Sequence, residues 1–140
     1  MKITKREVTH DELEMMKKDF RKIEIAYGVP EQNTRRLNVT VENDNGEIIG
    51  FASGLTNHKW FNLTDLWIHE KCRKQGLGSK ILKMLEQDIK AVGIKHIYTR
   101  TTGFDKNDVF YEKQGYKKFV TFENFFEVDG GHHFGLRKDL

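Results

Sequence analysis

The 140-residue sequence has little cysteine, little proline and no long apolar run. Its single cysteine, Cys72, excludes an intrachain disulfide, since a disulfide needs two thiols. No early apolar stretch has the pattern of a signal peptide or a membrane-spanning helix. We therefore expect a cytoplasmic location and no membrane partner.

The sequence also lacks a segregated excess of one charge. Its 24 Lys and Arg residues are interspersed with 21 Asp and Glu residues, which leaves a formal net charge of +3. This charge is too small to indicate a nucleic-acid partner, and a small anionic ligand would account equally well for a local excess. The length suits one domain with one core, residues 1–140.

The histidines show no spacing typical of a metal site. Positions 10, 58, 69, 96, 132 and 133 follow no pattern with carboxylates or with the cysteine, and His132 and His133 would point to opposite faces of a strand. Cys72 has no histidine partner at a recognisable spacing. We predict no metal and no cysteine nucleophile.

The first third of the chain predicts a strand, a helix and a hairpin. Residues 3–8 form a candidate strand, and Thr9 with Glu12 has the pattern of a capping box. The apolar residues that follow recur at steps of three and four, which predicts a core-facing helix: Leu13, Met16, Phe20, Ile23 and Tyr27. Gly28 and Pro30 end it. Alternation at residues 37–41 and 47–55, around Asn45-Gly46, predicts a β-hairpin.

The rest of the chain alternates between strand and helix patterns. Strands are predicted at residues 60–68, 95–100, 116–122 and 132–138, with a short helix at 105–114. The unit from the strand at 60–68 to the strand at 95–100 contains a helix, so we expect a right-handed parallel crossover. A mixed sheet with helices on its faces satisfies this order.

The segment Arg73-Lys74-Gln75-Gly76-Leu77-Gly78-Ser79 has the features of a phosphate-binding loop. Two glycines allow the backbone to approach a ligand, and they open a helix whose first N–H groups have no intrahelical partner. Arg73 and Lys74 add two cations. The helix is marked by apolar residues at helical spacing: Leu77, Ile81, Met84, Leu85, Ile89 and Val92, with Gly93 as its C-terminal cap.

Spacing separates this loop from two other glycine-rich loops. A dinucleotide fingerprint would need a glycine at Ile81, and a P-loop would need Gly-Lys-Ser/Thr where the chain has Gly78-Ser79-Lys80. The pattern Arg-x-x-Gly-x-Gly between a strand and a helix resembles the coenzyme-A-binding motif of the GNAT superfamily of N-acetyltransferases. The run from Phe110 to Tyr116 resembles the family's second motif. Phe104 stands where many members have an asparagine that contacts the coenzyme.

The resemblance implies an acyl-CoA N-acyltransferase fold of the α/β (α+β) class, with a mixed sheet of about seven strands and helices on both faces. It implies direct acetyl transfer from acetyl-CoA to a primary amine of a small molecule or peptide. The main chain around Trp67 and Ile68 would bind the pantetheine arm and polarise the carbonyl. The loop Arg73, Lys74, Gln75, Gly76, Leu77, Gly78 and Ser79 would bind the pyrophosphate.

Two residues are candidates for the proton transfers. Tyr111 matches the family tyrosine that can protonate the leaving thiolate, a transfer that the ordinary phenol and thiol pKa values make uphill by about two units. The alternative is a plain core aromatic. Asp65, an acid among apolar residues, is the candidate base, because burial would favour its protonated form. It could instead bond a neighbouring backbone, and Glu70, His69 or a water chain could take the role.

The acceptor has no sequence signature. Trp60, Phe61, Trp67 and the aromatic and acidic segment 122–129 would suit a cation with an apolar body. They fit equally well as core aromatics and a solvated loop. The alternative function is a non-catalytic module that binds CoA as a sensor or partner-binding unit. The late aromatic strands could pair between subunits in a homodimer.

Overall fold

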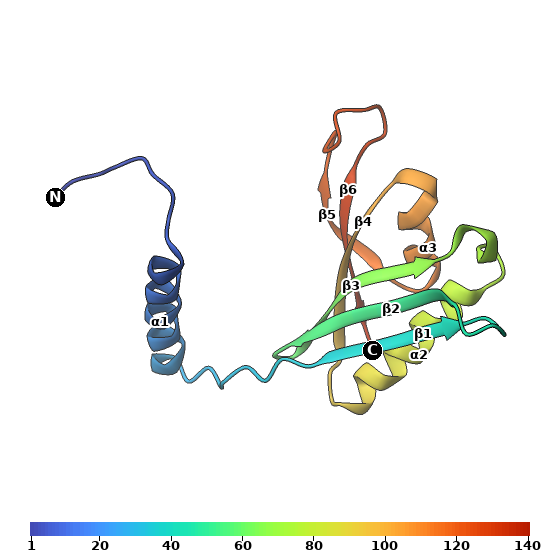
Figure 1. Ribbon diagram of the computed structural model, residues 1–140, viewed down its shortest axis with the longest axis horizontal. Coiled ribbons are helices and arrows are strands. Elements are labelled where there is room, and N and C mark those ends of the chain that lie inside the picture. Colours follow the sequence, from blue (N-terminus) through green and yellow to red (C-terminus); the bar gives the residue numbers. More distant parts are fainter. The chain divides into compact units, whose positions relative to one another are not determined.

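The computed structural model describes residues 1–140, which divide into two compact units at residues 1–32 and 33–140. The first contains one helix, and the second contains a six-stranded mixed sheet with two α-helices (Figure 1).

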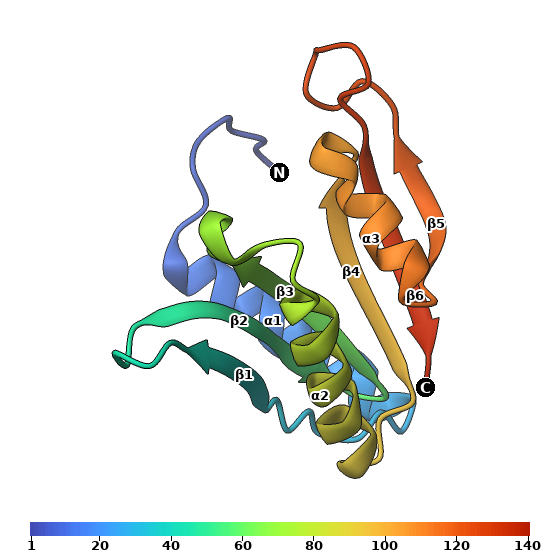
Figure 2. The same cartoon turned by 90° about the vertical axis from the view of Figure 1, so that its right-hand side faces the viewer.

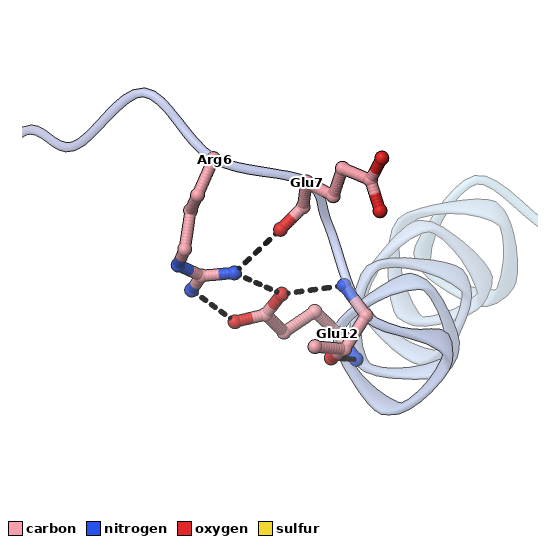
Figure 3. A network of polar contacts seen from close by, with 4 residues as sticks. Arg6, Glu7 and Glu12 are labelled. Atoms are coloured by element: carbon pink, nitrogen blue, oxygen red, sulfur yellow. Dashed lines mark hydrogen bonds and ion pairs between the residues drawn. The ribbon is translucent and has the colours of Figure 1, made fainter.

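The unit of residues 1–32 contains the helix α1, His10–Ala26. The predicted capping box is present: Thr9 Oγ1 accepts from the Glu12 N–H at 3.2 Å, and Glu12 Oε2 accepts from the Thr9 N–H at 2.8 Å. Arg6 donates to the Glu12 carboxylate as well (Figure 3). The predicted strand at residues 3–8 is wrong, since the segment pairs with no other strand. Alternation alone does not supply the hydrogen-bond partner that a strand requires.

The prediction that α1 faces a core is not met in this structure. No residue of the helix is buried, and Phe20 and Ile23 are 57% and 55% exposed. The spacing of the apolar residues and the capping box are properties of the local sequence, and they are sufficient to explain the helix boundaries. The local sequence does not determine which surface, if any, covers an apolar stripe.

The sheet of residues 33–140 has the strand order β1-β2-β3-β4-β6-β5. Only β3 and β4 pair in parallel, as the crossover pattern predicted, and every other neighbouring pair is antiparallel. The mixed α/β architecture is confirmed, with six strands where about seven were expected. The strands are β1 Arg36–Glu42, β2 Ile48–Asn57, β3 Trp60–Ile68, β4 His96–Thr102, β5 Lys117–Phe122 and β6 His133–Asp139.

Two helices of this unit cover one face of the sheet. They are α2, Leu77–Ala91, and α3, Asn107–Lys113, preceded by the 3-10 turns η1, Glu70–Cys72, and η2, Phe104–Lys106. Both contribute to one buried cluster with β2, β3, β4 and β6. Figure 2 shows α2 and α3 in front of the strands. We call the other face of the sheet, which neither helix covers, the distal face.

The core-facing side of α2 matches its sequence pattern except at two positions. Ile81, Leu85 and Ile89 are buried as expected, whereas Met84 and Val92 are 47% and 41% exposed. Leu82 is buried in their place. The apolar stripe therefore packs α2 against the core, and the N-terminus of the helix is not needed for this packing.

A β-bulge interrupts the pairing of β2 with β3. Leu63 pairs with Gly54 and Asp65 with Ser53, so Thr64 is an extra residue. A side chain at Gly54 would clash with the Asn62 carbonyl and the Phe61 ring, which fixes a glycine there. Because a one-residue shift reverses the facing of every later side chain, Leu63 faces the core while Asp65 lies on the distal face.

The parallel pairing of β3 with β4 ends early. It runs from Trp60 opposite His96 to Leu63 opposite Thr99, after which β3 pairs only with β2 and β4 only with β6. The two strands diverge in Figure 2. We call this divergence the fork. The Thr99 hydroxyl donates to the Leu63 carbonyl at 2.9 Å, at the closed end of the fork.

Partly buried ion pairs connect the two helices to strands β5 and β6. Lys118 on β5 bonds the carboxylate of Asp108, which is buried at the start of α3, at 2.7 Å. Lys138 on β6 bonds Glu86 on α2 at 2.8 Å, and the Tyr116 hydroxyl donates to the other oxygen of Glu86 at 3.1 Å. These contacts connect α3 to β5 and α2 to β6.

Candidate functional site

The loop from Arg73 to Ser79, which we call the cradle, connects the end of β3 to α2 through η1. Gly76 is the N-cap residue of α2 and has φ +79°, a left-handed conformation that favours glycine. No side chain caps the helix, and its first intrahelical bond is donated by the Lys80 N–H. The N–H groups of Leu77, Gly78 and Ser79 therefore remain as donors for an anion.

The cations of the cradle are exposed. Arg73 donates from Nε to the Ile68 carbonyl at 2.9 Å, which ties the loop to the end of β3 and leaves its terminal amino groups to face solvent. Lys74 has φ +59° and is also exposed. Two cations therefore lie in the same loop as three N–H groups without an intrahelical acceptor, and all five contribute positive potential there.

Residues of α3 and of its C-terminal cap contact the cradle. The Gln114 side-chain amide donates to Ser79 Oγ at 2.9 Å, and the position of a Cβ on Gly78 would lie 3.5 Å from the Phe110 ring. The first turn of α2 is thus packed on residues of the Phe110–Tyr116 run. The two sequence motifs are therefore adjacent in space, and the Phe110–Tyr116 run positions the first turn of α2.

The fork opens beside the cradle. From Thr64 to Ile68, β3 has no strand partner on its β4 side, so its main chain is accessible to an extended ligand that could pair as a strand would. Ile68 is half-buried and packs against the core, whereas Trp67 is 37% exposed and lies 5.6 Å from the Phe51 ring on the distal face. The segment around Trp67 and Ile68 therefore borders the open edge.

Tyr111 lies at the closed end of the fork. It is 7% exposed, and its hydroxyl lies near Thr99, the residue where β3 and β4 part. Burial raises the pKa of Tyr111 to about 12, and the nearby Thr99 hydroxyl offsets part of that rise. The ring also packs edge-on against Phe110 and Tyr116. The residue is thus a core aromatic whose polar atom reaches the fork.

Asp65 is exposed, so the predicted burial is wrong. The apolar neighbours of Asp65 in the sequence suggested a buried position, but the bulge at Thr64 turns the carboxylate to the distal face. Its Oδ2 lies 2.6 Å from the Thr64 hydroxyl. The candidate base is available to solvent and to a ligand arriving from the distal face. Of the alternatives, His69 uses Nδ1 to accept from the Lys71 N–H at 3.3 Å.

The aromatic residues predicted to bind an acceptor are dispersed. Phe61 is fully buried in the core and is therefore not available to a ligand. Trp60 stacks on His96 at 4.7 Å below the closed end of the fork, with the Arg137 guanidinium over its ring. The segment 122–129 is exposed, and its phenylalanine rings pack on one another and on His133. Phe104 contacts Phe126 at 5.3 Å.

No group of three or more His, Cys, Asp or Glu side chains is arranged to hold a metal ion. None of the helices has both the length and the apolar character needed to span a membrane.

Several residues of the site had no sequence signal. Thr99 is buried and polar at the fork, and nothing in its neighbourhood in the sequence distinguishes it. Ser53 and Asn38 lie in one row with Asp65 across β1, β2 and β3. A register of three strands cannot be read from one strand's pattern, so these neighbours become visible only in the fold.

The chain is similar to known acetyltransferases. Residues 35–118 match the model of the acetyltransferase (GNAT) domain. The chain is 31% identical over 97 residues to acetyltransferase Atu2258 of Agrobacterium fabrum, covering 67% of this chain and 70% of that protein.

Two solved structures have the same fold. An acetyltransferase from Bacillus cereus is 24% identical at a TM-score of 0.82, covering 99% of this chain and 98% of that one. An aminoglycoside 6'-N-acetyltransferase in complex with coenzyme A is 20% identical at a TM-score of 0.64, covering 74% and 72%.

Proposed function

Because the chain belongs to the GNAT acetyltransferase family, we propose that it transfers an acetyl group from acetyl-CoA directly to a primary amine. The observation that supports this most strongly is the fork beside the cradle. A helix N-terminus with free N–H groups and an unpaired strand edge lie next to each other, which suits the pyrophosphate and the amide-containing arm of one ligand.

In this proposal the pyrophosphate binds the N–H groups of Leu77, Gly78 and Ser79, with Arg73 and Lys74 neutralising its charge. The pantetheine arm lies in the fork and pairs with the β3 edge near Trp67 and Ile68. That main chain also supplies a donor for the thioester oxygen, whose negative charge grows in the transition state. Gly76 adopts the left-handed conformation that lets the backbone approach the ligand, and Gln75 precedes it in the same loop.

The chemical step forms a C–N bond and breaks the C–S bond. The amine nitrogen attacks the thioester carbonyl carbon, the coenzyme departs as a thiolate that takes up a proton, and the nitrogen loses a proton. A ligand in the fork is reached from the distal face, because α2 and α3 cover the other face. Asp65 on that face is the proposed acceptor of the amine's proton.

Tyr111 is the proposed proton source for the thiolate. Its pKa of about 12 keeps the phenol protonated at neutral pH, as an acid must be. Against a thiol pKa of about 8.5, the transfer is uphill by about 3.5 units, more than the ordinary phenol pKa predicted. The burial that retains the proton therefore also limits the rate gain that this residue can supply.

The test combines coenzyme binding with turnover. Calorimetry of CoA and acetyl-CoA measures binding, and release of free thiol across a panel of primary amines measures transfer. Thiol release that depends on the amine, with the acetylated amine as product, supports the proposal. Tight CoA binding without transfer to any amine in the panel contradicts it and favours a sensor module.

A further inference from the structure

A cavity of about 380 Å³ opens on the distal face over the first three strands. Its size is at the lower end of the range for small-ligand sites. It is lined by Asn38, Thr40, Phe51, Ala52, Ser53 and Asp65. Asp65 is the proposed base, so a ligand in the cavity lies beside the proposed acetyl site.

The polar groups of the cavity are oriented by hydrogen bonds. Arg36 Nη1 donates to Ser53 Oγ at 2.9 Å, so the Ser53 hydroxyl hydrogen is directed to Asn38 Oδ1 at 2.6 Å. A guanidinium has no acceptor, which fixes this direction. Asn38 Oδ1 is then occupied, and Nδ2 is left as a donor. The distal face thus presents one oriented amide donor in the cavity.

The opposite side of the same row carries an acceptor. Asn38 pairs with Ser53, and Ser53 with Asp65, so the three side chains stand side by side across the sheet. The Thr64 hydroxyl engages Asp65 Oδ2 and leaves Oδ1 as an anionic acceptor. Phe51, in the next row, adds an apolar wall. A ligand that matches the row has a cationic donor at one end and a neutral oxygen at the other.

The distance across the row limits the size of that ligand. Two strand spacings separate the Cα atoms of Asn38 and Asp65 by about 10 Å. After a hydrogen bond of about 2.9 Å at each end, the ligand's nitrogen and oxygen are separated by about 4–7 Å. A chain of about four carbons spans this distance.

We propose that this cavity is the acceptor site and that its substrates are small primary amines carrying a hydroxyl or carbonyl oxygen about four carbons from the nitrogen. The proposal rests on the proposed function. Asp65 holds the ammonium group beside the fork, Asn38 Nδ2 donates to the oxygen, and Phe51 covers the carbon chain. In a peptide, the nearest backbone carbonyl oxygen is attached to the sixth carbon from the lysine amine nitrogen, which exceeds this span.

The experiment compares 4-amino-1-butanol with n-pentylamine, which differ only in a hydroxyl in place of a methyl group. Each is titrated into the ¹⁵N-labelled full chain, with and without CoA, and the backbone amides of β1, β2 and β3 are followed. We expect shifts at Asn38, Ser53 and Asp65 and an affinity about 3- to 10-fold higher for the amino alcohol. Equal affinities, or shifts confined to other strands, would overturn the proposal.

The matched variants are Asn38→Leu and Asn62→Leu. Asn62 lies on β3 but does not line the cavity, so its substitution should leave the preference unchanged. Asn38→Leu should reduce the ratio of affinities to about one, and Asn38→Ala serves the same purpose should the leucine variant not fold. Retention of the preference in a folded Asn38 variant contradicts the assignment.

A Gly-Lys-Gly peptide tests the other class of acceptor. Binding of this peptide at least as tight as that of 4-amino-1-butanol would overturn the small-amine assignment in favour of a protein side chain. These titrations measure the amine without turnover. Failure of acetyl transfer would therefore count against the proposed function alone, and loss of the amine preference against the cavity assignment alone.

Discussion

The helices α1 and α2 begin in opposite ways. At α1 the side chains of Thr9 and Glu12 accept hydrogen bonds from backbone N–H groups, and Arg6 pairs with the Glu12 carboxylate (Figure 3). At α2 the N-cap is Gly76, which has no side chain to offer, and no other residue caps the helix. The N-terminus of α1 is capped by its own chain, and the N-terminus of α2 has no side-chain cap.

The apolar stripes of these helices differ as well. Four residues of α2 are buried, while α1 has none. Both stripes have helical spacing in the sequence. The N-terminus of α1 is capped and its apolar stripe is exposed. The apolar stripe of α2 packs against the sheet, and its N-terminus has no side-chain cap. The difference favours the start of α2 over the start of α1 as a site for an anionic ligand.

Gly76→Asp should have the largest effect, because it gives α2 the carboxylate that α1 already has. The new anion would occupy or repel the pyrophosphate position, and two lost charge-assisted bonds lower CoA affinity by about 10² to 10⁴. Calorimetry measures it. Gly46→Asp is the matched control, since Gly46 has the same φ of +79° in the hairpin turn. Equal CoA affinity in the folded Gly76 and Gly46 variants would show that the cradle does not bind the pyrophosphate.

Tyr111→Phe separates binding at α2 from chemistry at the fork. The ring and its packing remain, so CoA affinity and the melting temperature should change little. If the hydroxyl protonates the thiolate, kcat should fall by about 10². Steady-state kinetics with an accepted amine measures this. A kcat within about threefold of the unmodified enzyme would mean that the thiolate leaves unassisted or through water.

Asp65→Asn should have a smaller effect on the same reaction. The carboxylate is exposed, so water can replace part of its role, and kcat/KM should fall by about 10-fold to 10²-fold, near the low end for a general base. The acidic limb of the pH–rate profile should disappear while CoA still binds. Glu7→Gln, a neutralised carboxylate in the other unit, is the control. If the variant keeps both kcat/KM and the acidic limb of the profile, a group other than Asp65 accepts the amine's proton.

The start of α2 was predictable from the sequence because its determinants are local. The glycine spacing, the preceding strand and the apolar period lie within one continuous segment, and so does the Asn-Gly turn of the hairpin. The capping box of α1 is equally local. Each of these features is fixed by residues within about four positions of one another.

The fork and the facing of Asp65 depend on pairing between strands, so sequence alone did not predict them. Strict alternation places Leu63 and Asp65 on the same face, and the extra residue Thr64 reverses that. The strand predicted at residues 3–8 failed for a similar reason, since no edge accepts it. Periodicity describes a segment's two faces but does not identify the surface that each one meets.

Thr9→Ala should open part of the closed N-terminus of α1. Removing the cap oxygen exposes one N–H group and should cost about 1 kcal/mol of local helix stability, with CoA affinity unchanged. Amide hydrogen exchange in the first turn of α1 measures the loss. Thr4→Ala, in the preceding segment that forms no helix, is the matched control. Unchanged protection in Thr9→Ala would show that the capping bond does not hold the turn.

The smallest expected effect is a pH dependence confined to α1. The bond from Arg6, with that from the Thr9 N–H, lowers the pKa of Glu12 to about 2. A lowered pKa means that the helix favours the ionised form, so this stabilisation is complete above the ordinary value of 4.5 and is lost as the pH falls towards 2. The groups are fully exposed and screened by solvent, so the loss should be slight.

Carboxyl chemical shifts of Glu12 measured between pH 7 and pH 1.5 provide the test. The midpoint should lie near 2 in the unmodified chain and move towards the ordinary value of 4.5 in Arg6→Gln. A midpoint at the ordinary value in the unmodified chain would show that Arg6 does not hold the carboxylate. Added inorganic phosphate at neutral pH should then shift the amides of Leu77, Gly78 and Ser79 and leave those of α1 unchanged, because an ionised Glu12 already occupies that N-terminus.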